Sequence, residues 1–201
     1  MAATFPPRTF KHGEYVNAVP LRPGGMATVF SATHVPSGDR VAIKRHDRGD
    51  PARFQREGRL ICDPTLRSHR FSNHVVMGRE VFSEGGADYL VMELVDGLPL
   101  SERPFHHLPL RKALLLVDSI LNGIEYLHDS GCIHRDIKPQ NLLYLPHAST
   151  PYFVKIVDLG IARYADGLVT ATQFGMGTLT FTAPECFLYP YDSKETADLY
   201  R

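Results

Sequence analysis

The sequence predicts an α+β fold in which β-strands fill much of the first half and a long amphipathic helix organises the second. Two observations carry this prediction. Short runs rich in β-branched and aromatic residues recur between residues 15 and 95, separated by turns that contain glycine or proline. Residues 110–128 instead place apolar side chains at helical spacing, and this pattern ends at Gly131. We expect these apolar helix residues to belong to the core.

Length and composition favour one domain or two small lobes. The chain has 201 residues, enough to bury a substantial core, and Lys+Arg and Asp+Glu both number 22. This balance gives no basic field for nucleic acid, and no apolar run approaches the roughly 18 residues of a membrane span. The three cysteines are widely spaced, which favours free thiols in a reducing cytoplasm. We therefore expect a cytoplasmic protein with no nucleic-acid partner and no membrane segment in this chain.

The strongest functional signal is the octet HRDIKPQN at residues 134–141, which follows the long helix. An apolar strand that ends at Asp158 comes shortly afterwards. Polar residues on loops held by a rigid scaffold are where chemistry tends to concentrate. The spacing suits phosphoryl transfer, which uses a carboxylate to receive a hydroxyl proton, an ammonium for phosphate and two oxygen ligands for Mg²⁺. The residues that match these roles are Asp136, Lys138, Asn141 and Asp158. A polar loop without chemistry is the alternative.

The octet resembles the catalytic loop of the eukaryotic-type (Hanks-type) protein kinases, whose pattern is H-R-D-L-x-x-x-N. Lys138-Pro139 after the aspartate is the form found in Ser/Thr-directed members, and the bacterial members are the most similar in appearance. The resemblance runs from about Tyr15 to the last residue. It implies a bilobal fold, with a flexible lead at residues 1–12, a β-rich N-lobe at 13–95 and a partial, helical C-lobe at 96–201.

The resemblance also implies an activity and a role for each residue of the octet and its neighbours. A Ser/Thr kinase transfers the γ-phosphoryl group of ATP to protein hydroxyls, with Mg²⁺ or Mn²⁺ as cofactor. Asp136 would accept or orient the hydroxyl proton, and Lys138 would neutralise charge on the moving phosphoryl group. Asn141 and Asp158 would ligate the metal, and residues 158–160 (DLG) stand where the family has D-F-G.

Lys44 ends the run Val-Ala-Ile-Lys at residues 41–44, which is similar to the kinase signature that places an ammonium on the α- and β-phosphates. Such a cation needs a partner. A helix opening at Pro51 would put Phe54, Glu57 and Ile61 on one face, where a carboxylate is costly unless it is paired. We interpret Glu57 as the partner of Lys44. A solvated Glu57 is the alternative, because Gly58 weakens the helix by roughly 1 kcal/mol.

The nucleotide pocket implied by the resemblance draws mainly on the first lobe. The glycine-bearing turn at residues 21–29 departs from the family pattern G-x-G-x-x-G-x-V, since Arg22 and Ala27 replace the first and third glycines. Met92 would guard the back of the adenine pocket, and the backbone of Glu93 and Val95 would bond the adenine edge. The full set of expected nucleotide contacts is Leu21, Gly24, Gly25, Val29, Ala42, Lys44, Met92, Glu93, Val95 and Leu143.

Residues 161–182 are rich in Gly and Thr and resemble a kinase activation segment, which ends in Ala-Pro-Glu at 183–185. We hypothesise autophosphorylation at Thr170 or Thr172, because Arg135 precedes the catalytic aspartate and can pair with a phosphate there. Hydroxyl groups in a flexible loop are the alternative interpretation.

The chain ends where the family opens a long buried helix, at residues 198–201. Two explanations stay open: the chain is a fragment or truncated product, or a partner chain completes the C-lobe. A second class of function also stays open, namely a non-catalytic module that binds nucleotide or a partner protein. The intact set of Lys44, Asp136, Asn141 and Asp158 favours catalysis, while Arg22 and Ala27 favour the module.

Overall fold

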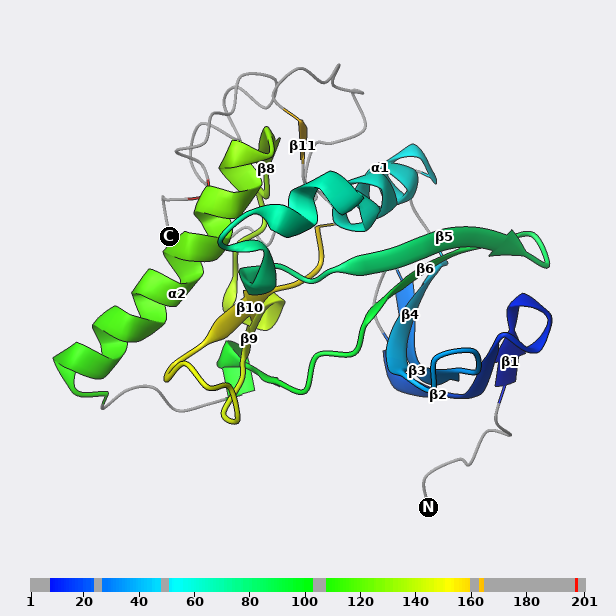
Figure 1. The fold of residues 1–201 in the computed structure, drawn as a ribbon, viewed down its shortest axis with the longest axis horizontal. Coiled ribbons are helices and arrows are strands. Elements are labelled where there is room, and N and C mark those ends of the chain that lie inside the picture. Colours follow the sequence, from blue (N-terminus) through cyan, green and yellow to red (C-terminus); the bar gives the residue numbers. More distant parts are fainter. Residues whose placement is uncertain are drawn as a thin grey trace. The chain divides into compact units, whose positions relative to one another are not determined.

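The computed structural model describes residues 8–23, 27–47, 51–102, 108–159, 163–164 and 198 (Figure 1). They fall into two units that divide the chain after Asp63, after Val76 and after Val95. The first unit takes residues up to Asp63 and Met77–Val95, and the second takes Pro64–Val76 and Asp96 onwards. The boundary after residue 95 that the sequence suggested coincides with one of these three divisions, and the sequence did not suggest the other two. Residues 64–76 belong with the second unit because their hydrogen bonds lead there, for example from Val76 N–H to the Ile156 carbonyl at 2.9 Å.

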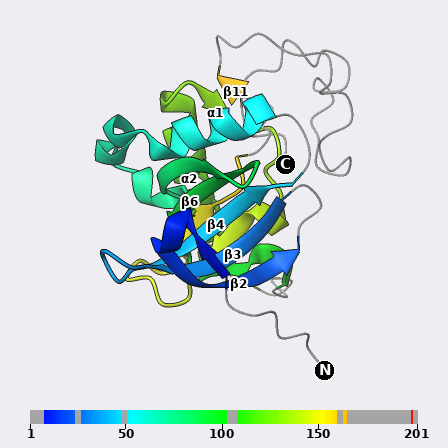
Figure 2. The same ribbon diagram turned by 90° about the vertical axis from the view of Figure 1, so that its right-hand side faces the viewer.

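A six-stranded antiparallel sheet forms most of the first unit, in the order β1-β2-β3-β4-β6-β5. Figure 2 shows β2, β3 and β4 side by side, and Figure 1 shows how the sheet curls. Tight turns with left-handed glycines, such as Gly85 and Gly86 between β5 and β6, suit the short hairpin connections. The strands are β1 (Arg8–Phe10), β2 (Tyr15–Pro23), β3 (Ala27–His34), β4 (Arg40–His46), β5 (Gly78–Glu84) and β6 (Ala87–Glu93).

Strand β1 and the 3₁₀ turn η1 (Lys11–Gly13) give residues 8–12 regular structure, where the sequence suggested a flexible lead over residues 1–12. Residues 1–7 lie outside the described residues. Arg8 pairs with Ala18 and Phe10 pairs with Tyr15 on β2. The Phe10 ring is buried, so burial of an aromatic side chain holds these residues to the sheet.

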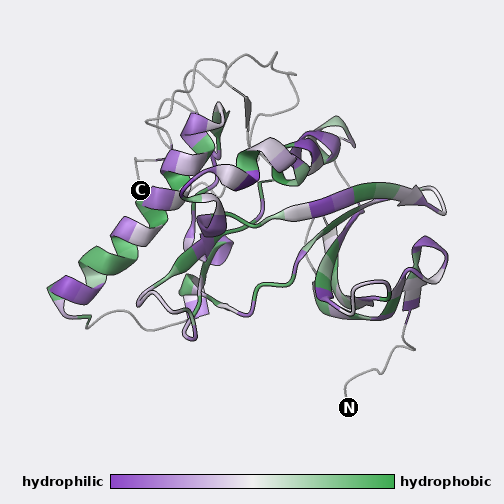
Figure 3. Ribbon diagram, in the orientation of Figure 1, coloured by the Kyte–Doolittle hydropathy of each residue, from purple (hydrophilic) through white to green (hydrophobic). Residues whose placement is uncertain are grey.

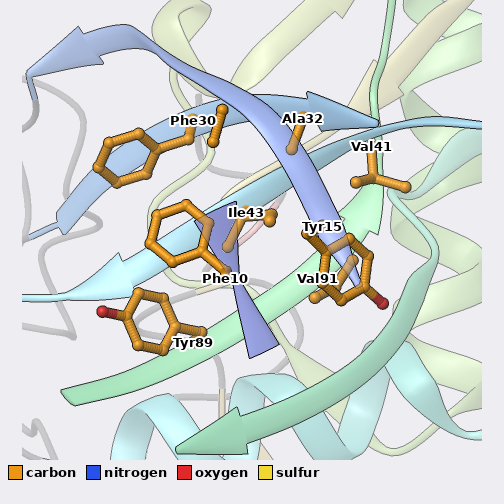
Figure 4. Close-up of a cluster of buried hydrophobic side chains, with 9 residues drawn as sticks. Phe10, Tyr15, Phe30, Ala32, Val41, Ile43, Tyr89 and Val91 are labelled. Atoms are coloured by element: carbon orange, nitrogen blue, oxygen red, sulfur yellow. The ribbon is translucent and has the colours of Figure 1, made fainter. Parts of the chain in front are cut away.

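The inside of the curl is an aromatic and aliphatic core (Figure 4). Phe10 lies edge-on to Phe30, with ring centroids 5.2 Å apart, and Phe82 stacks on Tyr89 at 4.9 Å. Such pairs add to the hydrophobic gain from burial. The buried members are Phe10, Tyr15, Ala18, Phe30, Ala32, Val41, Ile43, Tyr89 and Val91.

Side chains of β5 tie the two edges of the sheet together. The Glu84 carboxylate accepts the backbone N–H of Lys11 at 2.9 Å and that of His12 at 3.1 Å. Glu80 accepts Lys11 Nζ at 2.6 Å and the Tyr15 hydroxyl at 2.5 Å. These hydrogen bonds join β5 to η1 and to β2, which is not a neighbour of β5 in the sheet.

Helix α1 (Pro51–Cys62) packs on β5 within the first unit. The face of the sheet that bears Lys44 can be read from the register. Residues directly opposite in antiparallel strands carry their side chains on the same face. Lys44 lies opposite Val29 and Leu90, and Leu90 lies opposite Val81. Lys44 therefore shares a face with Val81 and Leu90, away from the aromatic core.

The second unit is built around α2 (Leu110–Asp129). Strand β10 (Val154–Ile156) pairs with β9 (Leu142–Tyr144), which pairs with β7 (Leu98–Pro99), and β8 (Cys132–Ile133) pairs with β11 (Arg163–Tyr164). Four 3₁₀ turns complete the described part of this unit: η2 (Pro64–Ser68), η3 (Ser72–His74), η4 (Leu100–Glu102) and η5 (Pro139–Asn141). The short strands and η5 carry the loops that hold the polar residues of the octet.

Helix α2 corrects the prediction that its whole apolar stripe is core. Its buried residues are Ser119, Gly123, Ile124, Tyr126 and Leu127. Figure 3 colours parts of the α2 ribbon green, for hydrophobic residues. Several apolar side chains in the first half of this helix are exposed: Leu110, Leu114, Leu115, Val117 and Leu121. No helix in the described ranges is both long and apolar enough to cross a membrane.

Candidate active site

Asp136 is the centre of a polar cluster in the second unit. Lys138 Nζ donates to Asp136 Oδ2 at 2.6 Å, and Asn141 Nδ2 donates to the same oxygen at 3.2 Å. Asn141 Nδ2 also donates to the Asp136 carbonyl at 2.9 Å, which fixes the loop around the carboxylate. The other oxygen, Oδ1, is buried and has no hydrogen-bond partner among the described residues. Buried acceptors without a donor are rare in proteins. An oxygen such as Asp136 Oδ1 could accept a proton from a substrate hydroxyl.

Asn141 and Asp158 are neighbours through the backbone. The Asn141 carbonyl accepts the N–H of Val157 at 2.9 Å, so the residue after Val157 lies beside Asn141. Because the Asn141 amide nitrogen faces Asp136, its amide oxygen is the atom left for another ligand. Asp158 has a left-handed φ of 63°, the kind of strained backbone that collects at functional sites.

These two oxygen donors fit Mg²⁺. That ion is usually bound through one or two carboxylates together with substrate phosphates, rather than by a complete protein cage. No group of three or more His, Cys, Asp or Glu residues able to hold a metal occurs in the described part of the chain.

Asp198 holds the backbone of the loop that carries Asp136. Its carboxylate accepts the N–H groups of His134 and Arg135, both at 2.7 Å, and lies 3.0 Å from His128 Nε2. Burial alone would raise the pKa of Asp198, but the hydrogen bonds from His128 and the two N–H groups hold the pKa below its usual value of 3.8. Arg135 has a left-handed φ of 67°, and the two backbone bonds keep it there.

Sequence reasoning identified Asp198 only as the start of a family helix. It lies 2% exposed beneath the loop, and its role rests on contacts between residues more than sixty positions apart. No local spacing reveals such a contact.

His134 supports the same loop as a neutral ring. The side chain is completely buried, and its Nδ1 accepts the N–H of Asp136 at 3.2 Å. Desolvation lowers the pKa of His134 below 6.5, although the carboxylates of Asp198, Asp158 and Asp136 oppose the shift. A neutral imidazole can accept at Nδ1, as this contact requires.

Lys44 and Glu57 form the expected pair in the first unit. Both carboxylate oxygens of Glu57 lie 2.8 Å from Lys44 Nζ. The Lys44 and Glu57 side chains are only 12% and 3% exposed. A pair so enclosed is held in one geometry, because separating it would leave a charge in a poorly solvated position.

The other expected nucleotide contacts divide between the two units. In the first unit, Ala42 lies opposite Met92, on the same face of the sheet as Lys44. The Glu93 N–H donates to the Met77 carbonyl at 3.0 Å, and Glu93 lies opposite Val41 on β4. Val29, Leu21 and Val95 also belong to the first unit, and Leu143 on β9 belongs to the second.

Four of the expected site residues lie outside the described residues: Gly24, Gly25, Thr170 and Thr172. The structure therefore brings together Lys44 with Glu57 in one unit, and Asp136, Lys138, Asn141 and Asp158 in the other.

The sequence matches a known family over nearly its whole length. Residues 15–200 match the protein kinase domain. Serine/threonine-protein kinase PknA of Mycobacterium tuberculosis is 36% identical over 190 residues, which cover 88% of this chain and 42% of PknA. Serine/threonine-protein kinases Pkn1 and pkn3 of Myxococcus xanthus are 32% and 33% identical over 170 and 175 residues. These matches cover 81% of this chain, 24% of Pkn1 and 31% of pkn3.

The chain thus spans less than half the length of these relatives. The family match, the two-unit α+β fold and the likeness to bacterial serine/threonine kinases agree with one another. The chain belongs to the protein kinase domain family.

Proposed function

We propose that this domain transfers the γ-phosphoryl group of ATP to serine or threonine hydroxyls of a protein substrate. The observation that carries the proposal is the Asp136 cluster. One carboxylate oxygen is occupied by Lys138 and Asn141, while the other is buried without a donor in the described residues. A substrate hydroxyl would supply that donor. Phosphoryl transfer asks a protein mainly for such positioning and for charge neutralisation.

Residues of the first unit would hold the α- and β-phosphates and the adenine of the nucleotide. Lys44, kept in place by both oxygens of Glu57, would donate to the α- and β-phosphates. The adenine edge would meet the carbonyl of Glu93 and the backbone of Val95, beside Met92. Because the ammonium is already ordered by Glu57, binding would cost little further side-chain entropy.

At the γ-phosphate, three residues would act. Asp136 Oδ1 would accept or orient the proton of the attacking hydroxyl, and Lys138 Nζ, 2.6 Å from Oδ2, would stabilise charge on the transferred group. The Asn141 amide oxygen and the Asp158 carboxylate would hold Mg²⁺ or Mn²⁺, which when bound neutralises negative charge on the phosphate oxygens.

Regulation by autophosphorylation of Thr170 or Thr172 is part of the proposal. Its support is the order of the sequence, with Arg135 next to Asp136 and paired threonines in a segment similar to kinase activation segments. The widely spaced cysteines support action in a reducing compartment such as the cytoplasm. Incubation with Mg-ATP should add phosphate to either threonine by intact-mass and peptide analysis, and its absence from both would remove this part.

A labelled-ATP transfer assay tests the proposal as a whole. The purified protein should phosphorylate itself or an added protein acceptor, and Asp136→Asn should lose the signal by a factor of about 1,000 or more. Equal signals from both proteins would contradict the proposal.

The replaced glycines at Arg22 and Ala27 favour one other candidate, a module that binds nucleotide without transferring phosphate. Thermal stabilisation by Mg-ATP with no transfer from the wild-type protein would support that module instead.

A further inference from the structure

Two glycines lie at the contact between α1 and β5, within the first unit. A Cβ atom built on Gly58 of α1 would lie 2.3 Å from Val81 Cγ2 of β5. A Cβ built on Gly78 of β5 would lie 2.5 Å from Cys62 Sγ and 2.7 Å from Ile61 Cγ1 of α1. Non-bonded atoms do not approach so closely, so a Cβ at either glycine would require the facing side chains of Val81, Cys62 or Ile61 to shift.

Backbone conformation does not explain these glycines. Gly58 and Gly78 are absent from the residues with positive φ, whereas Gly85, Gly86 and Gly131 have left-handed backbones. In a helix interior, glycine also costs stability relative to alanine. Close packing is therefore the physical reason for glycine at Gly58 and Gly78.

A β-bulge places both contacts on one face of β5. The register with β6 shifts between Gly78 and Glu80, which adds one residue to β5. Gly78 and Val81, three positions apart, thereby both meet α1, while Glu80 bonds Tyr15 on the other face. Val81 lies opposite Leu90, which lies opposite Lys44. The bulge thus directs the helix contact to the face of the sheet that carries Lys44.

Glu57 directly precedes Gly58 on the helix. Its side chain is 3% exposed, and both oxygens already lie at hydrogen-bond distance, 2.8 Å, from Lys44 Nζ. A shift of α1 away from β5 by about 1 Å would break hydrogen-bond geometry. The depth to which α1 sits on β5 therefore controls whether Glu57 reaches Lys44.

We propose that Gly58 and Gly78 are positioning residues, which let α1 sit close enough on β5 for Glu57 to hold the Lys44 ammonium. Their role in catalysis rests on the phosphoryl transfer proposed above, but the packing itself does not. Glycine at residue 58 is then a requirement of the ion pair, rather than a weak point of the helix.

The test uses a readout that needs no transfer. In the purified protein, the rate at which an amine-reactive acetylating reagent modifies Lys44 is followed by peptide mass spectrometry. Gly58→Ala should raise this rate several-fold, because Lys44 loses its partner and gains solvent. In the same protein, kcat for labelled-phosphate transfer should fall about 10- to 100-fold with the KM for the acceptor protein unchanged.

Two further variants separate positioning from general damage. Val81→Ala removes the methyl group that the new Cβ would meet, so Gly58→Ala/Val81→Ala should return Lys44 modification and kcat to the values of Val81→Ala alone. In a Glu57→Gln background, Gly58→Ala should cost little further activity, because both changes disrupt the same pair.

The outcomes are distinguishable. If Gly58→Ala leaves Lys44 modification unchanged and simply stabilises the protein, as helix propensity alone predicts, the proposal is overturned while the proposed function stands. If the wild-type protein transfers no phosphate, the proposed function fails and Lys44 modification still decides the positioning claim. If Gly58→Ala does not fold, the double variant Gly58→Ala/Val81→Ala decides the matter. The proposal is overturned if this double variant restores neither folding nor the Lys44 modification rate of Val81→Ala.

Discussion

The two polar groupings of this kinase domain are held by different forces. In the first unit, Lys44 and Glu57 sit on a strand and a helix, and the packing of α1 on β5 sets their distance. In the second unit, Asp136 lies on a loop whose geometry is set by hydrogen bonds. Asn141 donates to the Asp136 carbonyl, and the backbone N–H of His134 donates to the buried Asp198. A packed contact is destabilised mainly by a change in side-chain volume. A hydrogen-bonded loop is destabilised when one buried acceptor is removed, because its donors are left unsatisfied.

This difference predicts which substitutions should disrupt each grouping. The Lys44–Glu57 pair should respond to methyl groups added at the helix–strand contact. The Asp136 loop should respond to removal of buried polar atoms. Four substitutions test this contrast.

Asp198→Ala should have the largest effect, because it removes the carboxylate that accepts two backbone N–H groups of the Asp136 loop. The N–H groups of His134 and Arg135 would be left buried without an acceptor. We expect the free energy of unfolding to fall by about 4 kcal/mol in urea titrations, and transfer activity to be lost. Asp198→Asn, which keeps one acceptor oxygen, is the matched control and should lose about half as much. A loss below about 1 kcal/mol in Asp198→Ala would show that the loop does not depend on this carboxylate.

Glu57→Gln should break the pair of the first unit and leave the second unit intact. The Lys44 ammonium would face a neutral amide in place of the Glu57 carboxylate, and we expect the free energy of unfolding to fall by about 3 kcal/mol. Transfer should drop about 100-fold, since the ammonium no longer has a fixed position. Full activity in Glu57→Gln would separate this pair from catalysis.

His74→Gln should change the pH dependence of stability in the second unit. His74 is buried, close to Ser119 Oγ at 3.2 Å and the Val154 carbonyl at 3.3 Å. Desolvation lowers the pKa of His74 below 6.5, so the unfolded chain binds a proton at a higher pH than the folded protein does. Stability from this residue is therefore present above pH 6.5 and is lost as the pH falls towards the lowered pKa.

Urea unfolding at pH 5.5 and pH 7.5 measures this effect. The wild-type protein should lose stability at the lower pH, and His74→Gln should lose less. The buried His134 titrates in the same direction, so a smaller slope should persist in the variant. An identical slope in both proteins would contradict the assignment to His74.

Leu114→Ser should have the smallest effect. Leu114 lies 58% exposed on the first half of α2, so its replacement should change the free energy of unfolding by less than about 0.5 kcal/mol. Leu127→Ala, at a fully buried position on the same helix, is the contrast and should cost about 3 kcal/mol. Equal losses in thermal or urea unfolding would show that the exposed half of α2 is covered in solution.

Local signals in the sequence were enough to predict much of the fold and some of the contacts within the candidate site. Glu57 could be identified because a carboxylate on an apolar helix face needs a partner, and the structure provides Lys44. The octet at residues 134–141 could be identified because its polar groups are adjacent in the chain. The strands β3, β4 and β6 could likewise be expected from short runs of β-branched and apolar residues, although their pairing could not.

Contacts between distant residues could not be predicted in this way. Periodicity identifies apolar residues on α2 but not which of them are covered, and the covered half accepts Ser119 and Gly123 because His74 and Ile156 approach it closely. Three residues of β1 are too few to show alternation. The hydrogen bonds that anchor the backbone of His134 and Arg135 to Asp198 join residues more than sixty positions apart, so they depend on folding across the whole unit.

The most direct test of the account measures how Mg-ATP shifts the melting temperature of two variants and whether each transfers phosphate. If Asp158 holds the metal and Asp136 receives the proton, Asp136→Asn should keep the Mg²⁺-dependent stabilisation and lose transfer. Asp158→Asn should lose both. Transfer at the wild-type rate by Asp136→Asn, or full Mg²⁺-dependent stabilisation of Asp158→Asn, would contradict the division of roles proposed for these residues.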